Sequence, residues 1–448
     1  MKRYFPFMII GCLLLSVLFI PSADATEPSL YVNGVNMVDA DPSTYPAGCT
    51  YDSSTNTLTL NNANLTMDGD KKGNIYEGRN ILLNLVINGT NIITNNCTSE
   101  NRSGIYIWGS LNVTGSGTLN VAGSDTSSSV AIYVLKDMTM SGGIINASGT
   151  DDDLAVDGNL TMTGGTFNLV QSGTCCTLGT ISMSDSGALH AIATDPIGFS
   201  IRADKGLQMT GGSIWGSCGD EAQPQYGVND VLIEGGDANI SGGEILLKGN
   251  GSLSVLNGSL TVSGDAVITS EVAGTKNAIL AHNGMTITGG TITAKSMGDN
   301  GNDVIVQSGN FSMTGGILNL AGKGTMNVNG NISVSGGDIA AGGASACIHA
   351  IGGSVDVSGG MLEFGNVNAS QVLVTADGSL NCHNGTLTNM QVSGNSLTSI
   401  DGGTASLRVD SGHTPYSDDD FNRGMTIVIS IVPGILALGL FLWLRSRE

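Results

Sequence analysis

The sequence is poor in the residues that usually mark nucleic-acid-binding or metal-binding proteins. Its 448 residues hold 17 Lys and Arg against 38 Asp and Glu, which leaves a formal net charge of −21. A chain this acidic repels the phosphates of nucleic acids and of anionic lipids, so neither is an expected partner. No Cys-x-x-Cys motif occurs and the five His show no ligand spacing. No structural metal site is therefore predicted, and no cofactor is expected.

Aromatic residues are also scarce, at 5% of the chain, and charged residues make up only 12%. Apolar runs of membrane length or close to it occur at the two ends. Residues 1–25 have Lys2 and Arg3, an apolar run and Ala23-Asp24-Ala25, which is typical of a secretory signal peptide. Residues 425–444 carry no charge and are followed by arginines, so they predict a transmembrane helix with residues 445–448 in the cytoplasm.

These ends predict a cell-surface protein with an extracellular N-terminal region and a single membrane anchor. Residues 404–424 are polar and read as a linker in front of the anchor. Each end contributes a formal charge of +1, so the exported part carries −21 − 1 − 1 = −23. Fourteen Asn-x-Ser/Thr sequences also make glycosylation plausible on an exported surface.

What the chain has in abundance is glycine, 66 residues, much of it in a repeated unit. In the clearest copy, residues 285–294, two alternating runs flank the pair Gly289-Gly290. Such alternation predicts a strand, a corner and a second strand. Twelve copies align on a residue expected to point inward: Val113, Met140, Met162, Met183, Met209, Ile240, Val262, Ile287, Met313, Val334, Val357 and Cys382. A second inward column follows the corner: Leu119, Ile145, Phe167, Ile214, Ile245, Val267, Ile292, Leu318, Ile339 and Leu362.

Units of 21–31 residues that cannot bury their own apolar face must stack on one another. Leucine-rich repeats follow a different residue pattern, and propeller blades contain a different number of strands. Neither fold therefore fits the repeated unit. We therefore predict an all-β protein, a right-handed parallel β-helix with about 12–14 coils. Residues 111–403 hold the repeats, and residues 26–110, which lack the double glycine, are expected to form an N-terminal cap and the first coils.

The opening from Leu30 to Gly34, with Gly104-Ile105-Tyr106 and the run 111–119, resembles adhesin-like and carbohydrate-binding, pectate-lyase-like β-helix surface proteins of bacteria and archaea. The resemblance covers residues 29 to about 400. It implies a β-helix at the cell surface that binds a polysaccharide, a cell-surface glycan or another surface protein. No binding residue of that family can be carried over to a position of this sequence.

An enzyme of this architecture would need carboxylates on adjacent coils. The outward positions before the corners are instead short and polar: Asn112, Thr139, Thr161, Gln208, Asn239, Thr261, Thr286, Ser312 and Ser333, with Asp356 alone. The nearest charged cluster is Asp185, Asp195, Arg202, Asp204 and Lys205. We expect no catalytic residues and no enzyme, with a polysaccharide lyase or hydrolase as the third reading. Calcium could bind at 151–153 or 418–420, although solvated loops explain both acidic runs.

Four aromatic residues align in early coils and form the candidate ligand-binding site: Tyr76, Tyr106, Trp108 and Tyr133. Alternation would place Ile75, Ile105 and Ile132 inside and the tyrosines outside. A row of aromatics can bind sugar rings or a protein, or it can pack beneath the N-terminal segment. The sequence thus favours an adhesin-like or carbohydrate-binding surface protein, with a purely structural stalk or coat element as the alternative.

Overall fold

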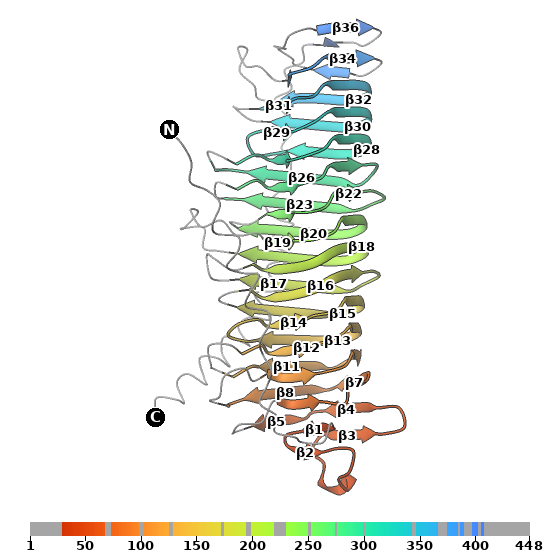
Figure 1. Ribbon diagram of the computed structural model, residues 1–448, viewed down its shortest axis with the longest axis vertical. Coiled ribbons are helices and arrows are strands. Elements are labelled where there is room, and N and C mark those ends of the chain that lie inside the picture. The colour runs from red at the N-terminus through yellow and green to blue at the C-terminus, as the bar shows by residue number, and fades with distance from the viewer. Residues whose placement is uncertain are drawn as a thin grey trace.

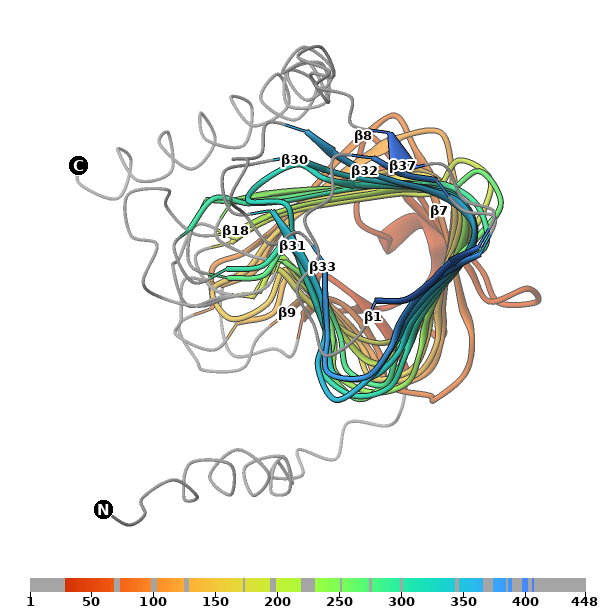
Figure 2. The ribbon, with the colours of Figure 1, turned by 90° about the horizontal axis from the view of Figure 1, so that it is seen from above.

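The computed structural model describes residues 29–67, 73–97, 103–124, 129–171, 174–193, 199–218, 230–249, 252–273, 276–298, 301–342, 346–365, 374–383, 386–388, 397–401 and 405–406. These residues form an all-β, right-handed solenoid of about 11 coils. The strands stack along the long axis of the molecule (Figure 1), and three sheets enclose the core (Figure 2). The expected signal peptide, transmembrane helix and tail lie outside the described residues, and so does the expected linker except for residues 405–406, which form a strand.

The first sheet contains the strands that precede the corners, all in parallel register. Its strands, some of which continue into another sheet, are β4 (Thr57–Asn61), β7 (Leu83–Asn88), β10 (Leu111–Gly115), β13 (Met138–Ser148), β15 (Leu160–Gln171), β16 (Cys176–Met183), β18 (Ile201–Cys218), β20 (Ala238–Gly249), β22 (Leu260–Val262), β25 (Met285–Ile287), β28 (Phe311–Leu320), β30 (Ile332–Gly342), β32 (Val355–Gly365), β34 (Leu380–His383) and β36 (Leu397–Asp401).

The second sheet follows the corners and takes in the latter parts of β13, β15, β18, β20, β28, β30 and β32. Its other strands are β5 (Asn64–Met67), β8 (Thr90–Asn95), β11 (Thr118–Ala122), β17 (Ala188–Ala193), β23 (Val267–Val272), β26 (Thr291–Ser296), β35 (Thr386–Thr388) and β37 (Ala405–Ser406).

The third sheet closes each coil and includes the first residues of β16 and β18. Its other strands are β6 (Gly73–Glu77), β9 (Ser103–Ile107), β12 (Ile132–Val134), β14 (Leu154–Val156), β19 (Val231–Ile233), β21 (Leu253–Val255), β24 (Ile279–Ala281), β27 (Val304–Val306), β29 (Thr325–Val328), β31 (Cys347–Ala350) and β33 (Val374–Ala376).

The first strands depart from the parallel pattern. β1 (Leu30–Val32) pairs antiparallel with β6 and with β2 (Val35–Asn36), and β3 (Cys49–Asp52) pairs antiparallel with β4. A short 3-10 helix, η1 (Pro42–Thr44), lies between them. At the other end, β34 to β37 continue the stack beyond the regular coils. The expected 12–14 coils are thus somewhat more than the regular coils of the structure, because the repeat continues into strands at both ends of the stack.

The first predicted inward column is confirmed from Val113 to Val357, because its residues are buried and each pairs with the next. The backbone of Cys382 continues the same register opposite Val357. The second column contains one error. Ile268, and not Val267, occupies the inward position opposite Ile292, and Val267 is 40% exposed. The corner Gly264-Asp265-Ala266 separates the two strands of this coil where Gly289-Gly290 serves in the next, so the extra residue shifts the alternation by one.

The double-glycine corners have a steric cause. Gly290 has φ of +78°, a conformation that residues with a Cβ rarely adopt, and an added Cβ would lie 2.6 Å from the carbonyl oxygen of Ala266. At the first glycine of another corner, Gly142, an added Cβ would lie 2.5 Å from the carbonyl oxygen of Gly115 in the preceding coil. Successive corners therefore contact each other directly through their backbones, which permits one coil for each strand spacing of about 4.8 Å.

Candidate functional site

The predicted aromatic row lies on the outer face of the third sheet. Tyr76 pairs with Tyr106 and Tyr106 with Tyr133 in the parallel register of β6, β9 and β12. The isoleucines that precede them, Ile75, Ile105 and Ile132, are fully buried, whereas the tyrosines are half-buried. The inward and outward assignments made from the sequence are thus those of the structure.

A fourth tyrosine extends the row and was not identified from the sequence. Tyr31 of β1 pairs antiparallel with Tyr76, and the two ring centroids are 6.3 Å apart. The alternation Leu30-Tyr31-Val32 marks β1 as a strand with Tyr31 on one side. It does not show that the strand returns to lie beside β6, because the first residues lack the repeat from which the register was read.

Neighbouring tyrosine rings of the row lie close together, one pair stacked and the others tilted. Tyr76 stacks on Tyr106 at 5.9 Å between centroids with an interplanar angle of 26°, and Tyr133 lies 5.2 Å from Tyr106 at 38°. Trp108 lies beside the row, with its ring 6.5 Å from that of Tyr106 and tilted by 53°. The row therefore combines one stacked tyrosine pair, two tilted tyrosine pairs and one tilted indole.

The phenol groups stay protonated well above neutral pH. Burial raises the pKa of Tyr106 to about 12, and the neighbouring Tyr76 and Asp157 contribute to the shift. Burial also raises the pKa of Tyr76, where a hydrogen bond with Trp108 acts in the opposite direction. The pKa of Tyr133 is raised by burial and by Asp157. Each hydroxyl can therefore donate a hydrogen bond at physiological pH.

Charged side chains continue the same face beyond Tyr133. The hydroxyl of Tyr133 donates to Oδ2 of Asp157 at 3.0 Å. In the register of the third sheet, the outward position after Tyr133 is occupied by Ala155, then Thr177, then Arg202. Arg202 forms ion pairs with Asp204 at 2.9 Å and with Glu234 at 2.5 Å.

The charged cluster expected from the sequence is only partly assembled. The corner where the third sheet passes into the first holds three of these residues close together: Arg202, Asp204 and Lys205. Asp185 instead lies in the turn between β16 and β17, at the corner between the first and second sheets, with φ of +49°. Asp195 lies outside the described residues. Residues that are near in sequence are thus divided between two corners of the solenoid.

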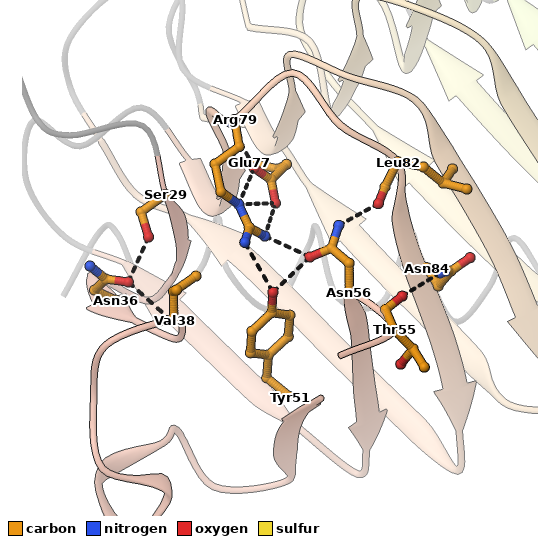
Figure 3. A network of polar contacts seen from close by, with 10 residues as sticks. All are labelled: Ser29, Asn36, Val38, Tyr51, Thr55, Asn56, Glu77, Arg79, Leu82 and Asn84. Atoms are coloured by element: carbon orange, nitrogen blue, oxygen red, sulfur yellow. Dashed lines mark hydrogen bonds and ion pairs between the residues drawn. The ribbon is translucent and has the colours of Figure 1, made fainter. Parts of the chain in front are cut away.

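A polar network joins the hairpin of β3 and β4 to Glu77 and Arg79 (Figure 3). Glu77 is fully buried, and Arg79 donates to both of its carboxylate oxygens, with Nη2 at 2.5 Å from Oε2. The same guanidinium donates to Tyr51 at 3.1 Å and to Asn56 at 2.6 Å, and Asn56 donates to the carbonyl of Leu82. Buried charges are paired in this way because an unpaired one is costly. The network joins β3, β4 and β6.

The outer face of the first sheet carries short polar side chains, as expected. From Asn112 to Ser333 the described outward residues in this register are Ser, Thr, Asn or Gln, and Asp356 follows. Asn112 donates to Asn84 of the preceding coil at 3.0 Å. No pair of carboxylates suited to glycoside hydrolysis stands in this file of the described residues.

Carboxylates at the entrance to the third sheet bind backbone groups. Asp303 accepts from the amides of Ser296 and Gly324, each at 2.7 Å, and Asp153 accepts from the amide of Gly149 at 2.7 Å. In the described part of the chain, no group of three or more His, Cys, Asp or Glu is arranged to hold a metal ion. Asp153 thus has a structural contact, and residues 418–420 lie outside the described residues.

A second aromatic pair occurs on the second sheet and was not predicted. His190 stacks on Trp215 of the next coil at 4.2 Å and 15°, and its Nδ1 lies 3.1 Å from Oδ1 of Asn168. Asn168 donates to Asn146 at 2.8 Å. Burial lowers the pKa of His190 to about 4, so the ring is neutral at physiological pH. These four residues occupy equivalent positions after successive corners: Asn146, Asn168, His190 and Trp215. That equivalence is the sequence signal that could have revealed their contacts.

Comparison of the chain with models of known protein families, with curated proteins and with solved structures finds no match. The fold agrees with the resemblance to parallel β-helix proteins stated above, and the likeness rests on the solenoid alone. Of the residues that the structure describes, none belongs to a helix long and apolar enough to span a membrane. The segment 425–444 is not among them.

Proposed function

We propose that this protein is an extracellular, membrane-anchored β-helix of the adhesin-like type that binds a polysaccharide or cell-surface glycan without chemical change. The observation that carries the proposal is the half-exposed file of Tyr31, Tyr76, Tyr106 and Tyr133 with Trp108 beside it. In a chain with 5% aromatic residues, five of them gather on one outer face. The signal-like start and the apolar segment 425–444 support the location.

The geometry also suggests how a glycan would be held. Phenol hydroxyls that stay neutral donate to sugar oxygens, and Asp157 accepts from sugar hydroxyls. Trp108, tilted away from the stack, supplies a ring face for the apolar side of a sugar. Near Trp108, Ile81 and Leu82 are 42% and 48% exposed, and Gly109 lies against the backbone of Ile81. These side chains give the corner an apolar surface beside the hydroxyl file.

The decisive variants keep the stack and remove only the hydroxyl groups. Tyr106→Phe with Tyr133→Phe retains the ring contacts, so the melting temperature should change little, while binding on an array of neutral and acidic glycans should fall at least tenfold. Trp108→Ala should weaken binding further. The matched control is Thr139→Ala with Thr161→Ala on the first sheet, which should leave binding unchanged. If the phenylalanine and Trp108 variants bind glycans as well as the unmodified protein does, the proposed site is wrong.

The structural alternative has an observation of its own. Neighbouring rings of the file contact one another, and Tyr31 brings the N-terminal strand onto the file. A stalk would need the file only for stability. In that case no glycan binds the intact ectodomain, residues 26–424, whereas the loss of stability in Tyr106→Ala is expected under both proposals.

The location is tested separately. Protease added to intact cells should digest the repeats if residues 26–424 lie outside the membrane. Protection of the repeats until the cells are lysed would show that the chain is not displayed at the surface.

A further inference from the structure

The cation best placed to bind an anionic ligand on the third sheet is already neutralised from within the protein. Arg202 follows the tyrosine file on the same outer face, three coils after Tyr133. Its Nε donates to Asp204 at 2.9 Å and its Nη2 lies 2.5 Å from Glu234. Two of the three guanidinium nitrogens that could bind a carboxylate or sulfate, Nε and Nη2, are therefore engaged by carboxylates of the protein.

The other arginine beside the file is engaged in the same way. Arg79 contacts the buried Glu77, Tyr51 and Asn56, and only 20% of its side chain is exposed. It balances a buried charge and cannot turn toward a ligand without leaving that charge unpaired.

Carboxylates outnumber cations along this part of the face. At this corner Asp137, Asp157, Asp204 and Glu234 stand against Lys136, Arg202 and Lys205. Asp157 lies at the end of the tyrosine file, where it accepts a hydrogen bond from Tyr133. Burial raises the pKa of Asp157, and the charge of nearby Lys205 acts in the opposite direction. The local field adds to the formal charge of −21 on the whole chain. Like charges brought together at low ionic strength repel and slow association.

We propose that the ligand of this face is a neutral polysaccharide, and that Asp157, Asp204 and Glu234 exclude polymers that carry uronate or sulfate groups. The proposal rests on the proposed function, because it names the ligand class of the same site. Specificity of this kind comes from repulsion of the wrong ligand as much as from contacts with the right one.

The test compares chemically matched polymers. The ectodomain is titrated with soluble β-glucan, mannan and galactan, and with derivatives of each in which oxidation has converted the C6 alcohols to carboxylates. The neutral polymer that binds should bind about tenfold more weakly after oxidation at low ionic strength, and the difference should shrink in 0.5 M salt as charges are screened, to roughly threefold or less.

A charge variant distinguishes the local carboxylates from the net charge. Asp204→Asn with Glu234→Gln releases Arg202, and binding of the oxidised polymer should rise about tenfold. Both side chains are more than 40% exposed, so the fold should be unaffected. The control, Asp338→Asn with Glu244→Gln, removes two exposed charges on the second sheet and should change binding little.

The outcomes separate the two claims. If oxidised polymers bind the unmodified protein as tightly as neutral ones, and that binding is lost in the Tyr106→Phe and Tyr133→Phe variant, the glycan site exists and the exclusion is wrong. Equal effects of the local and control charge variants also contradict the inference. If none of the polymers binds, the proposed function fails and the inference fails with it.

Discussion

The first and third sheets share one core and differ on their outer faces. From Asn112 to Ser333 the outward residues of the first sheet are uncharged, and most, such as Thr286, are half-buried. Outward residues of the third sheet contact one another across coils, from Tyr31 to Tyr133 and from Arg202 to Glu234. A parallel solenoid brings equivalent positions of neighbouring coils together. The type of side chain at a position therefore decides whether the coils also interact through that outer face.

The largest effect should come from a charge placed inside the first sheet. Ile287 is fully buried, so Ile287→Asp would leave a carboxylate without a partner and should cost at least about 3 kcal/mol of unfolding free energy. Thr286→Asp, on the same strand but outward, should change stability by less than about 0.5 kcal/mol. Chemical denaturation measures both. Equal losses would contradict the assigned facing. Alternation also places Thr293 on the outward side of its strand, but Thr293 is only 6% exposed, so Thr286 is the matched control.

Arg79 and Arg202 should differ in their contributions to the free energy of unfolding. Arg79→Ala leaves the fully buried Glu77 unpaired and should cost about 3 kcal/mol. Arg202→Ala removes exposed ion pairs that contribute at most about 1 kcal/mol. Denaturant midpoints of the two variants give the comparison. Similar losses would show that the N-terminal network is not a buried anchor.

The outer faces themselves are compared by truncating one residue on each. Tyr106→Ala removes ring contacts with Tyr76 and Tyr133 and should cost about 2 kcal/mol, because each aromatic pair contributes about 1 kcal/mol beyond burial. Thr139→Ala on the first sheet should be nearly neutral. Melting temperatures of the two variants test the difference, and a neutral Tyr106→Ala would mean that the tyrosine file adds no stability.

The last comparison concerns pH and one end of the third sheet. Burial raises the pKa of Asp152 from 3.8 to about 7. The folded protein thus holds this proton more tightly than the unfolded chain, so the stabilisation is complete below pH 3.8 and is lost as pH rises to about 7. The melting temperature should be higher at pH 5 than at pH 8, and Asp152→Asn should reduce that difference. An unchanged pH profile in the variant would assign the dependence to other groups, such as Asp153, whose pKa burial also raises.

The repeat by itself determined the solenoid, the inward column from Val113 to Val357 and the outward position of Tyr76, Tyr106 and Tyr133. Period-two alternation and equal spacing carry this information, because a slip of one residue would expose the core. The prediction from the repeat was wrong at Val267, because an extra residue in the corner shifted the alternation by one.

Only the tertiary structure decided which outer residues meet. Tyr31 reaches Tyr76 through an antiparallel return of the chain, Arg79 reaches Tyr51 through the hairpin, and Arg202 reaches Glu234 of the next coil. The orientation of the rings toward one another also depends on side-chain rotation, which alternation does not specify. Contacts between coils depend on loop lengths and rotamers. For that reason the residues of the candidate site could be predicted from the sequence, and the geometry of their contacts could not.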